Sequence, residues 1–129
     1  MTDRYEEGMQ VRREVLSDAH VDAANERMTG FTRDFQSLIT RYAWGEIWSR
    51  LGLFCRMCSV ITLTAFIAGG HWEELAMHVA AARRNGLSDE EISEIILQTA
   101  IYCGVPAANH AYAIAGETLR RLNSEGTQQ

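Results

Sequence analysis

Three groups of side chains have residue types and spacings that could carry out chemistry. His78 stands on an apolar stripe at helical spacing, where an imidazole that is neutral or protonated according to its partners suits proton transfer. Glu46 precedes Arg50 by four positions, so its carboxylate could act as an acid or base or could pair with that arginine. Cys55 and Cys58 have the spacing of a dithiol. These residues suggest either proton transfer or thiol chemistry.

Each group also has a non-catalytic interpretation. A histidine on an apolar stripe is more often a hydrogen-bonded core residue than a catalytic one. A Glu46 to Arg50 pair on a solvated helix face is common and contributes only about 0.3 kcal/mol. Buried cysteines often pack as small hydrophobic residues. For His78 and Glu46, the residue pattern alone favours these non-catalytic roles.

Composition excludes several classes of protein. With 129 residues, 47% of them hydrophobic, the chain can bury one core, which predicts a single domain over residues 1–129. The net charge of −5 argues against binding to nucleic acid or to an anionic membrane surface. The apolar run 60–69 is too short to span a bilayer, and the charged N-terminus lacks the apolar stretch of a secretory signal. We therefore expect a cytoplasmic protein with reduced cysteines.

The pattern of capping residues and apolar spacing predicts an all-α fold. Only one proline, Pro106, interrupts the chain, and there are no hairpin signals. Asp18 is expected to cap the second helix, Ser88 begins a capping box, and Gly104 ends the helix after it. The expected helices are 5–16, 19–28, 32–48, 55–68, 72–85, one between Ser88 and Gly104, and one that starts near Pro106. Residues 1–30 are interpreted as an N-terminal helical extension and residues 124–129 as a frayed tail.

The helix expected over residues 55–68 is apolar on almost every side. Such a helix must be covered all round, and a monomer of this length can bury few of them. The pattern therefore predicts a homo-oligomer.

Three stretches resemble the 4-carboxymuconolactone decarboxylase family. They are residues 41–50 (RYAWGEIWSR), 73–79 (EELAMHV) and 102–109 (YCGVPAAN), and the likeness extends from about Thr32 to Ala115. The resemblance implies a single-domain helical bundle of the alkyl hydroperoxidase D-like type, assembled as a homo-oligomer and often a hexamer. Peroxidase relatives carry a CxxC pair at the positions of His71 and Glu74, so that redox site is absent here.

The activity that the resemblance implies is a decarboxylation without metal or organic cofactor. 4-Carboxymuconolactone would lose carbon dioxide to give the 3-oxoadipate enol-lactone, a step of protocatechuate degradation in the β-ketoadipate pathway. The lactone is its own electron sink, because the electron pair can move through the ring double bond to the carbonyl oxygen. The protein must bind two carboxylates, stabilise the oxyanion and deliver a proton.

The matching positions supply candidates for these tasks. The resemblance implies catalytic roles for His78, as the group that transfers the proton, and for Glu46. Two tryptophans could wall the pocket or pack as ordinary helix residues, and Asn109 and His110, expected in the first turn of the last helix, could face an anion. The expected substrate-binding residues are Trp44, Trp48, Arg50, Arg83, Tyr102, Asn109 and His110.

The chain departs from the family pattern after residues 41–50, the tryptophan motif. Leu51 stands where a proline is usual, and Cys58 stands where an arginine is usual. If the usual arginine binds a substrate carboxylate, the second change weakens the dicarboxylate site, and it also creates the Cys55 and Cys58 pair. A thiol-dependent peroxidase using these cysteines is the first alternative function, and a non-catalytic helical assembly subunit is the second.

Overall fold

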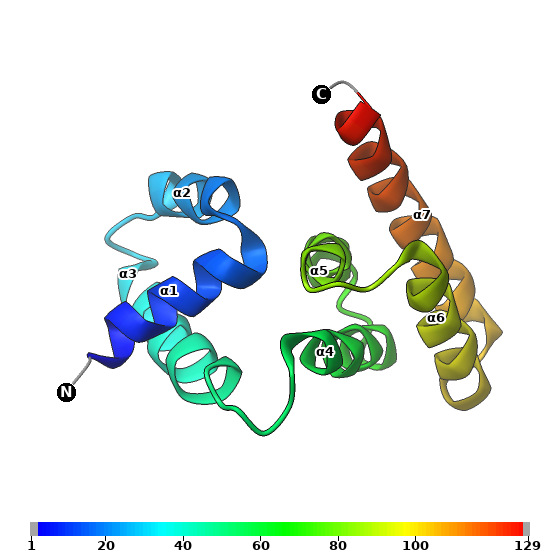
Figure 1. Cartoon of the computed structure of the whole chain (residues 1–129), viewed down its shortest axis with the longest axis horizontal. Coiled ribbons are helices and arrows are strands. Elements are labelled where there is room, and N and C mark those ends of the chain that lie inside the picture. The colour runs from blue at the N-terminus through cyan, green and yellow to red at the C-terminus, as the bar shows by residue number, and fades with distance from the viewer. Residues whose placement is uncertain (1–2, 128–129) are drawn as a thin grey trace. The chain divides into compact units, whose positions relative to one another are not determined.

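The computed structural model describes residues 3–127 and is helical, without strands, over this part of the chain (Figure 1). The predicted all-α class is confirmed. Contacts divide the chain into two compact units, Met1–Cys55 and Arg56–Gln129. The expectation of one domain stays a prediction.

The N-terminal unit consists of α1 (Arg4–Leu16), α2 (Asp18–Arg27), α3 (Arg33–Ile39) and the π-helix η1 (Thr40–Trp48). α1 packs directly against η1, as Figure 1 shows within this unit. The two backbones meet at Gly8 and Gly45, where a Cβ on Gly8 would collide with the carbonyl oxygen of Thr40 and one on Gly45 would lie 2.5 Å from that of Arg4. Only glycine permits so close a crossing. The segment expected as an N-terminal extension thus contributes, through α1, to holding the tryptophan motif.

Two local expectations for this unit need correction. Ser17, not Asp18, caps α2, and its hydroxyl accepts a hydrogen bond from the amide of His20 at 3.1 Å. Asp18 is instead the first helical residue. The single helix expected over residues 32–48 changes from α to π geometry at Thr40. The π segment is only nine residues long, too short for the spacing of its apolar residues to distinguish π from α winding.

The C-terminal unit consists of α4 (Cys55–Gly69), α5 (Trp72–Arg84), α6 (Asp89–Cys103) and α7 (Val105–Thr127). α5 and α6 pack on α7, and α4 contributes Leu63 and Ile67 to the same core. The capping box is present: Ser88 accepts from the amide of Glu91 while the Glu91 side chain accepts from that of Ser88. The core of this unit is made of Leu63, Ile67, Leu75, Val79, Ala82, Leu87, Ile92, Ile95, Ile96, Ala108, Ala111 and Ala115.

Two helices of the C-terminal unit, α5 and α6, end at glycines. Gly86 and Gly104 have φ values of 99° and 97°, a region that other residues adopt only with strain, and they end α5 and α6 as predicted. The expected frayed tail, residues 124–129, is helical as far as Thr127, and its last two residues lie outside the described residues. None of the helices in residues 3–127 is both long and apolar enough to cross a membrane.

Candidate active site

The π-helix η1 carries three of the predicted site residues. Trp44 is 5% exposed and its ring lies 5.1 Å from that of Trp48, so the two indoles form one packed aromatic pair. Glu46 stands between them in sequence and is half-buried. π-Helical turns are rare and occur frequently at functional sites, because their wider winding projects side chains in directions that an α-helix cannot. Here that winding coincides with the tryptophan motif.

Glu46 forms an ion pair with Arg4 of α1. The sequence suggested Arg50 as its partner, and that pairing is wrong. Four-residue spacing brings side chains together on an α-helix, but these residues follow π geometry, and η1 ends at Trp48 before Arg50 is reached. Arg50 itself is exposed in the segment after η1. The carboxylate of Glu46 therefore has a cationic partner from another helix of its own unit.

His78 lies on the buried face of α5. His78 is 6% exposed. The centroid of its ring lies 5.2 Å from the ring centroid of Phe66 on α4, at an interplanar angle of 55°. Leu75 and Val79 flank it in the core cluster. A histidine in such surroundings is shielded from bulk water, which is the environment in which enzymes hold a proton-transfer group.

Arg83 is committed to contacts between helices of the C-terminal unit. Its Nη1 donates to the carboxylate of Asp89 at 2.6 Å and to the side-chain oxygen of Asn123 at 3.1 Å. These bonds join the end of α5 to the start of α6 and to α7. A substrate carboxylate would have to compete with Asp89 for this guanidinium. The substrate-binding role of Arg83 stays a prediction, and the structure shows a role in joining helices instead.

The remaining predicted residues lie around α6 and α7. Tyr102 is 80% exposed and lines a cavity of about 500 Å³ between α4 and α6, together with Val60, Thr99 and Cys103. The ring of His110 stacks on that of Trp72 with centroids 4.1 Å apart. Stacking on an indole fixes the direction of the imidazole plane.

The expected position of Asn109 and His110 in the first helical turn is wrong. α7 begins at Val105, directly after Gly104, so both residues stand one turn beyond the helix start. The free amide groups of a helix belong to its first four residues, which here precede Asn109. The anion-binding argument from the helix terminus therefore does not apply to these two side chains.

Cys55 is the first residue of α4 and is exposed, whereas Cys58 is half-buried one turn later. Arg56, between them, forms an ion pair with Glu91 of the capping box. Arg56 thus joins α4 to α6.

Sequence reasoning missed several residues that shape these surroundings. Arg4 pairs with Glu46, Phe66 contacts His78, and Trp72 stacks on His110. Of these residues, only the aromatic ones could have been noticed in the sequence, because they are large and lie at helical spacing. In residues 3–127 no group of three His, Cys, Asp or Glu side chains is arranged to hold a metal ion. Glu46 belongs to the N-terminal unit and His78 to the C-terminal unit.

Comparison with known proteins gives consistent results. Residues 33–117 match the carboxymuconolactone decarboxylase family. The chain is 42% identical over 119 residues to 4-carboxymuconolactone decarboxylase of Acinetobacter baylyi, covering 92% of this chain and 89% of that protein. It is 38% identical over 122 residues to nitrosuccinic acid decarboxylase of Metarhizium robertsii, covering 95% and 85%. A 43-residue match, 56% identical, to 4-carboxymuconolactone decarboxylase of Pseudomonas putida covers 33% and 90%. The chain therefore belongs to the carboxymuconolactone decarboxylase family.

Proposed function

We propose that this protein is a carboxy-lyase that decarboxylates 4-carboxymuconolactone to the 3-oxoadipate enol-lactone, within the protocatechuate branch of the β-ketoadipate pathway. The observation that carries the proposal is the 42% identity to a protein of that name over nearly the whole chain. The buried imidazole of His78, shielded by Phe66, supports it by supplying a group suited to proton transfer.

The chemistry assigns separate tasks to the side chains. The bond to the departing carboxylate breaks, and its electron pair moves through the ring double bond to the lactone carbonyl oxygen, giving a dienolate. His78 then delivers a proton to carbon. Glu46 is the second proposed catalytic residue, and its carboxylate is paired with Arg4 within the N-terminal unit. The substrate itself accepts the electrons, so the step needs no added electron sink.

Nitrosuccinic acid is a second candidate substrate. The relative at 38% identity is named for nitrosuccinic acid, and the difference from 42% is too small to separate the two substrates. In both reactions a group of the substrate accepts the electron pair that carbon dioxide leaves behind. This group is the unsaturated lactone in one substrate and the nitro group in the other. Cys58 stands where the family usually has an arginine, so a cation that could bind a substrate carboxylate is replaced there by a thiol.

The first experiment measures carbon dioxide release and enol-lactone formation from enzymatically generated 4-carboxymuconolactone, with nitrosuccinate assayed in parallel. We expect the wild type to exceed the spontaneous rate with the lactone, and the Cys55→Ser, Cys58→Ser double variant to match the wild type within about twofold. A wild type no faster than buffer would reject the lactone as substrate. Loss of activity in the double variant would point instead to thiol chemistry.

We further propose that the protein works as a homo-oligomer, with a hexamer as the expected assembly. α4 buries only Ser59, Leu63 and Ile67 against its own chain. Large apolar side chains remain exposed along α4, α6 and the start of α7, and a second copy of the chain could cover them. They are Met57 (48% exposed), Ile61 (56%), Leu97 (51%), Ile101 (75%), Tyr102 (80%) and Val105 (75%).

Ile101→Glu is expected to dissociate this assembly. A carboxylate placed in an apolar contact loses its hydration without gaining a partner, so association becomes unfavourable. Light scattering after size exclusion should show a smaller species that keeps the helical circular dichroism of the wild type. Glu90→Gln, a change of charge at an exposed position of the same helix, serves as the control and should leave the mass unchanged. An unaltered mass for Ile101→Glu would remove this face from the interface.

A further inference from the structure

Arg12 is a buried cation without an anionic partner. The residue is only 7% exposed, and no carboxylate pairs with it within the described residues. Its Nη1 donates to the hydroxyl of Thr40 at 3.4 Å and its Nη2 to Oε1 of Gln36 at 3.3 Å, both longer than usual. Its Nε is buried and makes no hydrogen bond. Burying a charge in this way costs free energy unless an opposite charge is bound.

The burial also lowers the pKa of the Arg12 guanidinium from its ordinary value, although the side chain stays charged. A guanidinium presents its N–H donors in a planar fork that matches the two oxygens of a carboxylate.

Arg12 lines a pocket of about 310 Å³ whose walls all come from the N-terminal unit. Two more arginines, Arg33 and Arg41, line it, and Asp3 is its only acidic residue among those described. The carboxylate of Asp3 accepts from the amide of Tyr5 and caps α1. A concentration of three arginines is unexpected in a chain with a net charge of −5. It makes the pocket locally positive.

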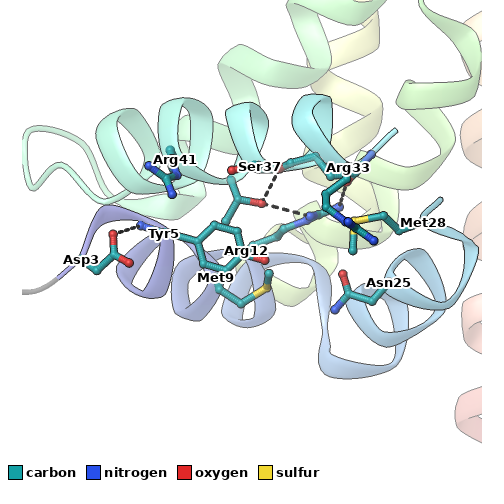
Figure 2. Close-up of a pocket in the computed structure, with 11 residues that line it drawn as sticks. Asp3, Tyr5, Met9, Arg12, Asn25, Met28, Arg33, Ser37 and Arg41 are labelled. Atoms are coloured by element: carbon teal, nitrogen blue, oxygen red, sulfur yellow. Dashed lines mark hydrogen bonds between the residues drawn. The ribbon is translucent and has the colours of Figure 1, made fainter. Parts of the chain in front are cut away.

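Figure 2 shows how these cations are spread. Arg41 lies toward the end of the pocket that holds Asp3 and Tyr5, with its guanidinium carbon 5.9 Å from the Tyr5 ring centroid. Arg33 lies toward the opposite end, near Met28 and Asn25. A volume of about 310 Å³ is at the small end of the range for ligand pockets. An anion with charges at two ends fits this arrangement better than a compact one.

We propose that this pocket binds a small organic dicarboxylate, with one carboxylate on the guanidinium of Arg12 and the other toward Arg33 or Arg41. None of the residues predicted for decarboxylation lines the pocket. The site is thus an additional ligand site, and its occupation does not depend on which lactone the enzyme uses.

Titration calorimetry of the full-length protein with succinate tests the proposal, at constant ionic strength, with acetate and inorganic phosphate as comparison ligands. We expect succinate to bind more tightly than either. Arg12→Gln should weaken succinate binding at least tenfold, because a charge-assisted bond is lost. Arg33→Gln, at an exposed position, should weaken it about two- to fivefold. Arg27→Gln, in the same unit but outside the pocket, is the matched control and should bind as the wild type does.

Several results would overturn the proposal. Succinate binding that survives intact in Arg12→Gln would belong to another site. Equal affinity for phosphate and succinate would leave only a non-specific anion site. If Arg12→Gln does not fold, as judged by circular dichroism, the Arg33→Gln and Arg41→Gln pair decides the question, because both positions are exposed. Wild-type affinity in both of these variants would reject a dicarboxylate site.

Discussion

His78→Ala is expected to lower kcat for decarboxylation by about 10²- to 10⁴-fold, the range that loss of a general acid or base usually produces. The imidazole is the only ionisable side chain among the buried residues of α5, and Phe66 shields it from water. A water molecule admitted in its place could donate a proton, but it would be neither positioned nor tuned for the task. Carbon dioxide release under saturating substrate gives the measurement.

Two controls separate proton transfer from packing. His71→Ala removes an exposed histidine at the N-cap position of α5, where its side chain makes no capping hydrogen bond, and it should change kcat by less than about twofold. His78→Gln keeps much of the volume and the polarity of the side chain but cannot titrate, so it should fold normally and remain nearly as slow as His78→Ala. If His78→Gln regained most of the activity, His78 would be a positioning residue and not the proton donor.

The helices of the C-terminal unit were predictable because their signals are local. The capping box at Ser88, the glycines at 86 and 104 and the apolar stripe through Leu75 and Val79 each act within a few residues of where they stand. The burial of His78 followed from the same stripe. A local signal needs no knowledge of the remaining chain.

The site around Glu46 could not be predicted in this way. Its partner, Arg4, is distant in sequence and approaches only because Gly8 and Gly45 let α1 and η1 come into backbone contact. Arg12 shows the same limit, since nothing in the local sequence distinguishes it from the other arginines of α1 as the one that is buried beside Thr40. Tertiary contacts, rather than propensity, decide these positions.

Gly8→Ala is expected to destabilise the protein by about 3 kcal/mol, at the upper end of the cost of overpacking. The added Cβ would collide with the carbonyl oxygen of Thr40 and lie 2.8 Å from the amide nitrogen of Gly45. Both obstacles are backbone atoms, so no side-chain rotation can relieve them and α1 must move away from η1. Urea denaturation at fixed protein concentration measures the loss as a lower midpoint with an unchanged slope.

The matched control is Gly116→Ala, in the interior of α7, where an added Cβ would meet nothing within 4 Å. It should be neutral or stabilise the protein by up to about 1 kcal/mol, because alanine favours a helix more than glycine does. Movement of α1 would also separate Arg4 from Glu46, so Gly8→Ala should lose decarboxylase activity even at temperatures where it remains folded. Denaturation of Gly8→Ala at the wild-type midpoint would mean that the two helices do not cross at these glycines, and the support proposed for Glu46 would fail with that result.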